Sequence, residues 1–445
     1  MAEIDEAEDL GVAERAKRDR KAAEQHTREW RADAKEDLAF VDGSGQWDEK
    51  DAQALRDALR PPITFNRIEP VIDVICGLEL SNRQEVRFIP RESGDVKVSE
   101  VTTAAADWVR DGCDAEDEES DAFRDMAICG MGWTETRMDY EQDPDGKILI
   151  TRIDPLEMVW DSNATKKNLA DARWIGRIKK YTKEEIKTEW PDKYQEVTGV
   201  SDLWEDDLDA TTPHSNEAGD QYDNEAGDSK RENLLKVFEY QWFETVPAWR
   251  VNDPMKDELV TLDVAQFNRM KKRVEEMGVD PDTIQAVKQK KRVYKRAFVV
   301  GDVVLEEGDG PCDHSFTYRA MTSKRDRAKN TWYGVVRGMK DPQRWANKWL
   351  SQILHIINAN AKGGIMAEQD AFVNPRKAEE QWAKPDSITL VKKGALSQGK
   401  IEQKAPIVFP SGLDKLMEFA VMSIRDVSGV NVDMLASREG NGTSG

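Results

Sequence analysis

The pattern that most constrains this chain is the order in which helical and strand-like periodicity follow one another. Apolar residues recur at helical spacing in 12–40, 68–78 and 99–130, and the period changes to that of short strands from Gly132 onward. Strand-like segments then dominate until a long amphipathic helix opens near Asp341. Because helices and strands do not alternate one by one, a doubly wound or barrel enzyme is disfavoured, and the sequence predicts an α+β fold.

The long helix has the clearest sequence boundaries. Asp341 suits the N-cap and Pro342 suits the first helical position, where its missing N–H costs nothing. Gly363-Gly364 is expected to end the helix. The apolar side of this helix comprises Trp345, Trp349, Ile353, Ile356 and Ile357.

Shorter segments give expectations of their own. Asp143–Gly146 is a strong turn sequence and predicts a hairpin of two strands, Gly132–Tyr140 and Lys147–Ile153. Thr182 with Glu185 three residues later predicts a capping box at a helix start. Further strand-like pieces are expected at 63–66, 84–90, 388–391 and 401–403, and a last helix at 411–427.

The charge of the chain limits the partners that it can hold tightly. The formal net charge is −21 over 445 residues, whereas tight nucleic-acid binders usually carry a positive surface. Basic stretches at 271–273, 288–296 and 323–329 are interpreted as solvated faces, with a local phosphate contact or docking surface as the alternative. The acidic segment 201–232, which twice contains Glu-Ala-Gly-Asp, is expected to be a mobile loop.

The sequence gives no coherent catalytic constellation, and we expect neither a cofactor nor a metal. The segment Gly394–Lys400 has the glycine spacing and the lysine of a phosphate-binding loop, but Ile401 replaces the magnesium-binding Ser or Thr. We interpret it as a glycine-bearing loop between two strands. Gly130-Met-Gly132 is interpreted as a tight helix-to-strand turn. The four unpaired Cys suggest reduced thiols and synthesis in a cytosol, and no apolar run is long enough to span a membrane.

Six segments, taken together and in order, resemble the portal proteins of tailed bacteriophages, in particular the family typified by those of short-tailed enteric phages. They span nearly the whole chain. Turn formers at Asp154-Pro155 and Asp161–Asn163 and a helix start at Lys340–Gln343 suit an architectural protein. The segments are 40–47, 63–72 with Asn82-Arg83, 123–133, 153–174, 333–344 and 428–431.

The resemblance implies a portal fold: a mixed α/β wing, a helical stem and a small β-containing clip, assembling into a dodecameric ring. The expected divisions are a wing at 1–234, a first stem helix and clip within 235–330, a second stem helix at 331–362, and a channel loop with the rest of the wing at 363–445. The family's crown and barrel are expected to be absent, because the sequence ends at Gly445.

The resemblance also suggests site residues and partners. Channel-facing or DNA-facing candidates are Lys348, Lys362, Gly363 and Gly364, and subunit-interface candidates are Trp345, Trp349, Ile353 and Ile356. The implied partners are further copies of the chain, double-stranded DNA that passes through without tight binding, terminase, major capsid and scaffolding proteins, and tail adaptor proteins. The implied location is the portal vertex of the virion, after synthesis in the host bacterial cytoplasm.

Two other functions remain open from the sequence. Segment Gly394–Lys400 is the basis for a nucleotide-binding DNA-packaging enzyme, and nucleotide-dependent stabilisation lost in Lys400→Ala would favour it. Another capsid or scaffold protein is the second alternative, and it would form shells or stay monomeric.

Overall fold

The computed structural model describes residues 11–58, 60–83, 86–90, 95–140, 143–198, 234–253, 258–276, 286–362, 365–382, 388–403 and 412–429. The chain separates into two compact units. Unit 1 comprises Met1–Leu38 and Ile75–Val335, and unit 2 comprises Ala39–Val74 and Val336–Gly445. Each unit is described by itself below. The acidic segment 201–232, expected to be a loop, lies outside the described residues.

Unit 1 contains most of the strands. Its helices are α1 (Val12–Val41, which continues into unit 2), α3 (Glu69–Ser81, which begins in unit 2), α4 (Val96–Gly112), α5 (Ala115–Cys129), α6 (Lys183–Glu189), α7 (Tyr194–Thr198) and α9 (Val264–Glu276), with a 3-10 turn at Pro155–Glu157. Its strands are β1 (Met131–Asp139), β2 (Lys147–Ile153), β3 (Met158–Trp160), β4 (Trp174–Thr182), β5 (Leu234–Asp253), β6 (Glu258–Asp263), β7 (Ala286–Val300), β8 (Val303–Asp309), β9 (Tyr318–Thr322), β10 (Lys324–Asp326) and β11 (Thr331–Tyr333).

The strands of unit 1 pair in antiparallel fashion throughout the described residues. The main sheet has the order β3-β4-β5-β7-β8, and β6 pairs with the outer part of β5; a second sheet has the order β2-β1-β9. Antiparallel sheets with helices placed on their faces are the α+β arrangement, so the fold-class prediction is confirmed.

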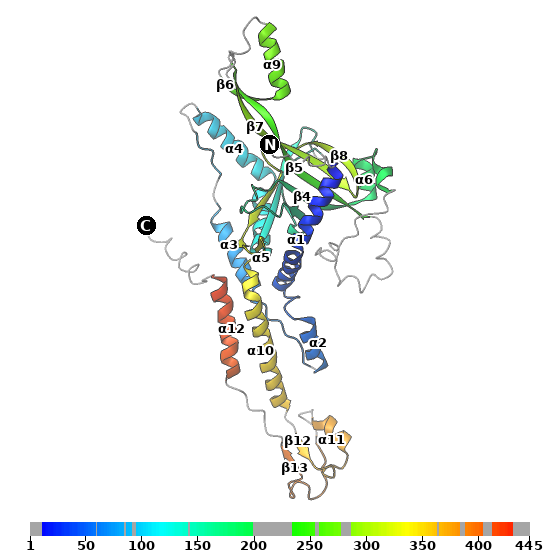
Figure 1. Ribbon diagram of the computed structural model, residues 1–445. Helices are drawn as coiled ribbons and strands as arrows, with labels where there is room; N and C mark the ends of the chain where they lie inside the picture. Colours follow the sequence, from blue (N-terminus) through cyan, green and yellow to red (C-terminus); the bar gives the residue numbers. More distant parts are fainter. Residues whose placement is uncertain are drawn as a thin grey trace, which may run out of the picture. The chain divides into compact units, whose positions relative to one another are not determined.

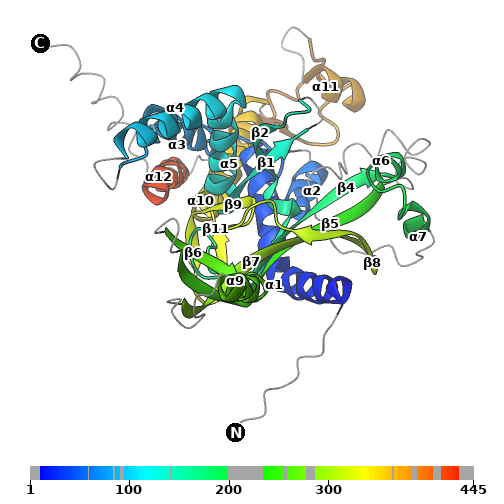
Figure 2. The same ribbon diagram turned by 90° about the horizontal axis from the view of Figure 1, so that it is seen from above.

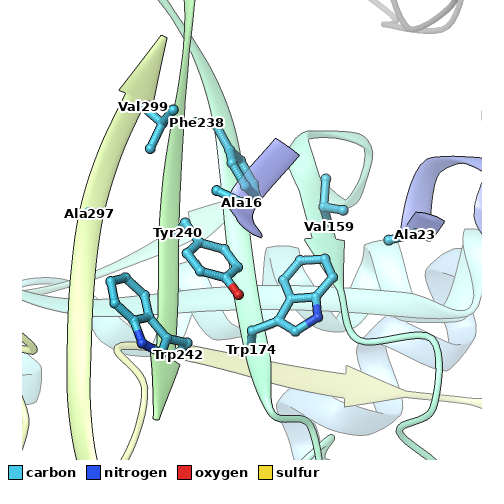
Figure 3. Close-up of a cluster of buried hydrophobic side chains, with 9 residues drawn as sticks. All are labelled: Ala16, Ala23, Val159, Trp174, Phe238, Tyr240, Trp242, Ala297 and Val299. Carbon is cyan, nitrogen blue, oxygen red and sulfur yellow. The ribbon is translucent and has the colours of Figure 1, made fainter. Parts of the chain in front are cut away.

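The core of the main sheet is built on period-2 alternation along β5. Phe238, Tyr240 and Trp242 point to one face, where Trp174, Ala297 and Val299 join them (Figure 3). Ala16 and Ala23 of α1 pack on this face, and their small side chains let the helix approach the rings. The Tyr240 hydroxyl donates a hydrogen bond to Asp19 of α1 at 2.8 Å. A second core lies on the opposite face of the sheet, where Leu235 and Val237 of β5 pack with Ile186 of α6 and Val197 of α7. Figure 2 shows α6 and α7 beside this sheet.

Unit 2 is mostly helical (Figure 1). Its elements are α2 (Glu49–Asp57), α10 (Val336–Lys362), β12 (Ile365–Ala367), α11 (Pro375–Trp382), β13 (Ile401–Gln403) and α12 (Gly412–Ser428). Helices α10 and α12 pack against each other, and the small module of β12, α11 and β13 lies between them in the chain. They run antiparallel, because Gly338 near the start of α10 faces Val427 near the end of α12.

Many local predictions are confirmed. Helix α1, the β1–β2 hairpin and α12 match their expected ranges, and α10 ends at Lys362 as the Gly363-Gly364 pair indicates. The capping box is present: Thr182 N–H donates to Glu185 Oε2 at 2.7 Å, and Glu185 N–H donates to Thr182 Oγ1 at 3.2 Å. Gly130 ends α5 with φ of 92°, as a tight helix-to-strand turn requires.

Three predicted strands are wrong in the described residues. Residues 63–66 are extended but pair with no strand, and residues 86–90 are likewise unpaired. Residues 388–391 form a single bridge, between Val391 and Phe372. Short apolar runs reveal local extension but not the presence of a partner strand, which is set by tertiary packing.

The predicted start of the long helix is also wrong. Helix α10 begins at Val336, so Pro342 lies inside it rather than at its first position. Val336 and Met339 are fully buried, and their burial contributes roughly 1.5–3 kcal/mol each. This outweighs the roughly 3 kcal/mol that an interior proline costs.

Candidate functional site

Six of the eight candidate site residues lie on helix α10, and they differ in their exposure to solvent. Ile353 and Ile356 are buried within unit 2, while Trp345 is 52% exposed. The rings of Trp345 and Trp349 are adjacent, with centroids 5.5 Å apart. The apolar side of α10 is therefore divided into a face that holds unit 2 together and an aromatic pair at the surface.

Lys348, a channel candidate, is held in place by two contacts. Its Nζ lies 2.5 Å from Asp51 Oδ2 and 5.5 Å from the centre of the Trp345 ring. Lys362 is the last residue of α10, and Gly363 and Gly364 lie outside the described residues. The channel and interface roles of all eight residues stay predictions.

Sequence reasoning missed a buried network of side-chain amides that joins α10 to Gln46 and Asn66. The side chains of Gln46, Gln343 and Asn347 are almost completely buried. Asn347 Nδ2 donates to Gln46 Oε1 at 2.9 Å, and Gln343 Nε2 donates to Asn347 Oδ1 at 3.0 Å. We call these residues, with Asn66, the amide network. The i, i+4 spacing of Gln343 and Asn347 was the only local signal for it.

The amide network fixes the extended segment 63–66 on α10. Asn347 Oδ1 accepts from the backbone N–H of Phe65 at 3.1 Å, and Gln343 Nε2 donates to the carbonyl of Phe65 at 2.7 Å. Asn66 Oδ1 accepts from Gln46 Nε2 at 2.9 Å. The backbone of 63–66 has no strand partner, so its N–H and carbonyl groups need side-chain partners. The network therefore takes residues from three segments that carry the portal resemblance: 40–47, 63–72 and 333–344.

Helix α12 presents two different faces. Ala420 and Ile424 are buried in unit 2, and Leu416, Phe419 and Met422 are 46–68% exposed. The buried face is the one that contacts α10. The two helices are close there, because a Cβ added to Gly338 of α10 would lie 2.7 Å from the Val427 side chain of α12. An exposed row of large apolar side chains at helical spacing is typical of a helix with a further partner.

Unit 1 contains a buried arginine that joins α1 to the 3-10 turn and β3. Arg31 donates to the carbonyl oxygens of Leu156 and Met158, the latter at 2.6 Å. Burial lowers the pKa of Arg31 to about 10, while the nearby Glu24 carboxylate opposes that shift. The guanidinium remains charged at neutral pH, and its fork geometry matches two backbone carbonyls.

A second buried charge in unit 1 joins α5 to β2. Arg152 Nε donates to Asp125 Oδ2 at 2.6 Å, and the Arg152 backbone N–H donates to Glu118 at 2.6 Å. Burial raises the pKa of Asp125 to about 6, even though Arg152 acts in the opposite direction. Asp125 and Arg152 lie in the resemblance segments 123–133 and 153–174 or directly beside them.

The loop at Gly394–Lys400 is closed by hydrogen bonds within its own backbone. The N–H groups of Gln398 and Lys400 donate to the carbonyls of Gly394 and Ala395 at 3.0 Å each. Strand β13 follows this loop, where a phosphate-binding loop leads into a helix. Lys400 Nζ lies 3.4 Å from Glu368. The arrangement is a self-contained turn rather than a cradle of free N–H groups.

In the part of the chain that the structure describes, no group of three His, Cys, Asp or Glu side chains is placed to hold a metal ion. No described helix combines the length and apolar character that crossing a membrane requires.

A comparison with protein families gives a match over nearly the whole chain. A family model described as "Phage P22-like portal protein" matches residues 17–445. No curated protein matches the chain. The match covers both units and includes every segment that carries the resemblance.

Proposed function

This chain belongs to the phage P22-like portal protein family, and from that premise we propose that it forms a dodecameric ring at one vertex of the capsid. The ring would be the channel through which the genome is packaged and later ejected. It would also be the docking site for terminase and tail adaptor proteins, and it would contact the major capsid and scaffolding proteins. The family is structural, and we assign the chain no catalytic step.

The observation that carries this proposal is the extent of the family match, which leaves only the first 16 residues outside. Two features of the structure support it. The resemblance segments of unit 2 meet in the amide network, and those of unit 1 contain Asp125 and the two carbonyls that accept from Arg31. Residues that hold elements together, rather than residues poised for chemistry, are what a conduit requires. A closed ring also requires two different contact surfaces on every subunit.

The exposed apolar rows are our candidates for those contact surfaces. Trp345 and Trp349 of α10 and Leu416, Phe419 and Met422 of α12 are apolar side chains at least partly open to solvent in the single chain. The channel roles of Lys348, Lys362, Gly363 and Gly364 rest on the resemblance alone.

The division into wing, stem and clip stays a prediction, and the described elements suggest a second assignment. Residues 235–330 contain six strands and the 13-residue helix α9. A long antiparallel pair with a small β-containing module between its members occurs instead at α10, 365–403 and α12. We propose this pair as the two stem helices, with 365–403 as the clip.

The test is the mass of the purified full chain by mass photometry, together with end-on images in negative stain. We expect rings with a central hole. Replacing Phe419 and Met422 by Asp should abolish the rings, while Glu418→Gln, exposed on the same helix, should retain them. A monomer whose melting temperature rises with ATP, with the rise lost in Lys400→Ala, would instead identify a nucleotide-binding packaging enzyme.

A further inference from the structure

An arm formed by the outer half of the β5–β7 ribbon, β6 and α9 extends the main sheet of unit 1 (Figure 1). Residues 245–251 of β5 pair with 286–292 of β7, and 248–253 pair with β6. Trp249 of β5 stacks on Phe267 of α9 with ring centroids 4.7 Å apart, and Phe267 is 5% exposed. The two ladders and the ring stack fix the helix on the ribbon, so the arm presents its side chains from a defined surface.

This arm carries a net positive charge in a chain that is strongly acidic. Its described residues, 245–253, 258–276 and 286–292, contain nine Lys or Arg and five Asp or Glu residues, while the whole chain carries −21. Eight cations of the arm are exposed, and no ion pair joins any of them to another described residue. They are Arg250, Arg269, Lys272, Arg273, Lys288, Lys290, Lys291 and Arg292.

The arm differs in this respect from the part of β7 directly beside it. Lys295 and Arg296, just inside the arm on β7, are paired with Glu244 and Glu306. Unpaired like charges repel one another, so their concentration at one place costs folding free energy that an anionic partner would recover.

The spacing of the cations suits an extended polyanion. Lys288 and Lys290 lie on one face of β7, opposite Trp249 and Pro247 of β5, at a separation of about 6.8 Å set by the strand rise. Lys291 points to the other face, and α9 adds Arg269, Lys272 and Arg273 at helical spacing. A strand of DNA presents one phosphate for about every 3.4 Å of helix axis, so alternate residues of the ribbon match every second phosphate.

We propose that this arm binds the phosphate backbone of double-stranded DNA. The inference rests on the proposed portal function, which makes DNA the polyanion that the protein handles. It differs from passage through a channel without tight binding, because exposed Lys and Arg attract the phosphates. The contact is sequence-independent, since Lys and Arg on phosphates fix position without reading bases.

The test measures binding of the full chain to a fluorescent duplex of random sequence by anisotropy, across roughly 50 to 200 mM salt. One variant combines Lys288→Gln, Lys290→Gln and Lys291→Gln, and a second combines Arg269→Gln, Lys272→Gln and Arg273→Gln. The matched control, Lys166→Gln, Lys167→Gln and Arg327→Gln, removes three exposed cations of unit 1 away from the arm. Circular dichroism confirms folding of each.

We expect each arm variant to weaken binding about 10-fold or more and to reduce the slope of log K against log salt by about 2 to 3, with the control unchanged. Equal loss in the control, or unchanged binding in both arm variants, overturns the proposal. The proposal is also overturned if the chain binds poly-glutamate and duplex DNA fails to displace it. The arm would then be a surface for acidic polypeptide.

Imaging of the same samples separates this inference from the proposed function. If the parent and the arm variants all form rings and bind DNA equally, the arm's role is overturned and the portal function stays intact. Loss of rings in the parent chain would count against the portal function, whatever the binding data show.

Discussion

The two units hold their buried polar groups in different ways. In unit 1 these groups are largely charged and include Arg31, Asp125 and Glu135, whereas in unit 2 they are mainly the neutral Gln46, Gln343 and Asn347. Lys340 is the one buried charge of unit 2 among the described residues. Each contact of a buried charged group contributes more to the free energy of unfolding than a neutral contact does, and removal of its partner costs more. The contribution of a charged group also depends on pH. The stability of unit 1 should therefore be more sensitive to both substitution and pH.

The largest effect is expected from Arg31→Leu. It leaves the carbonyls of Leu156 and Met158 buried without their donor, so unit 1 should lose about 2–6 kcal/mol of unfolding free energy. Chemical denaturation followed by hydrogen exchange in α1 and β3 measures this. Arg18→Leu, an exposed position on the same helix, should change stability by less than about 0.5 kcal/mol. Comparable losses from both would mean that the buried contacts carry no special weight.

A pH-dependent effect is expected from Asp125→Asn. The pKa of Asp125 is raised from 3.8 to about 6 in the folded chain, so the folded state retains a proton that the unfolded chain releases between these values. The contribution of Asp125 is full below about pH 4 and is lost as the pH rises through 6.

Relative to the parent, Asp125→Asn should therefore gain about 2–3 kcal/mol in unit 1 between pH 4 and pH 7. Hydrogen exchange of α5 at several pH values measures the difference. Asp121→Asn, on the same helix but less buried, is the control. A flat difference between variant and parent across this range would contradict the raised pKa.

A smaller, pH-independent effect is expected from Asn347→Leu in unit 2. The substitution leaves the Phe65 N–H and Gln46 Oε1 without their partner and should cost about 2 kcal/mol. Asn358→Leu, exposed on the same helix, should be near neutral. Melting curves at pH 4 and pH 7 provide the measurement, and a loss that varies with pH would break the distinction between the two units.

The smallest effect is expected from Lys348→Met. Its ion pair with Asp51 is partly exposed on both sides, so its removal should cost about 0.5 kcal/mol at low salt and almost nothing at 1 M salt. Thermal melts at the two salt concentrations test this. A loss above about 2 kcal/mol that persists in high salt would place Lys348 among the structural residues of unit 2.

These contacts explain how far the sequence could predict the molecule. Helix α1, the β1–β2 hairpin and the Thr182 capping box depend on neighbours within a few residues, so periodicity and turn chemistry suffice. The amide network joins Gln46 to Asn347 across 301 positions, and no local pattern reports such a pairing. The start of α10 was missed because burial of Val336 and Met339 outweighs the local preference of Pro342 for a helix start.

The candidate site follows the same division. The apolar spacing of Trp345, Trp349, Ile353 and Ile356 was readable, but which of them face solvent depends on α12, whose position the spacing does not encode. The basic stretches 271–273 and 288–296 were likewise visible separately. Only the ribbon register and the Trp249–Phe267 stack place them on one arm.

Pro342 has a mechanical consequence for α10. Proline has no N–H to donate to the carbonyl of Gly338, so the ladder of helical hydrogen bonds is interrupted there. The same Gly338 is the point at which α12 comes close, through Val427. A force along α10 would therefore be taken up as bending between its second turn and the rest, while the Gly338–Val427 contact resists sliding of one helix past the other. Helix α10 is therefore expected to bend near Pro342 instead of behaving as a uniformly stiff helix.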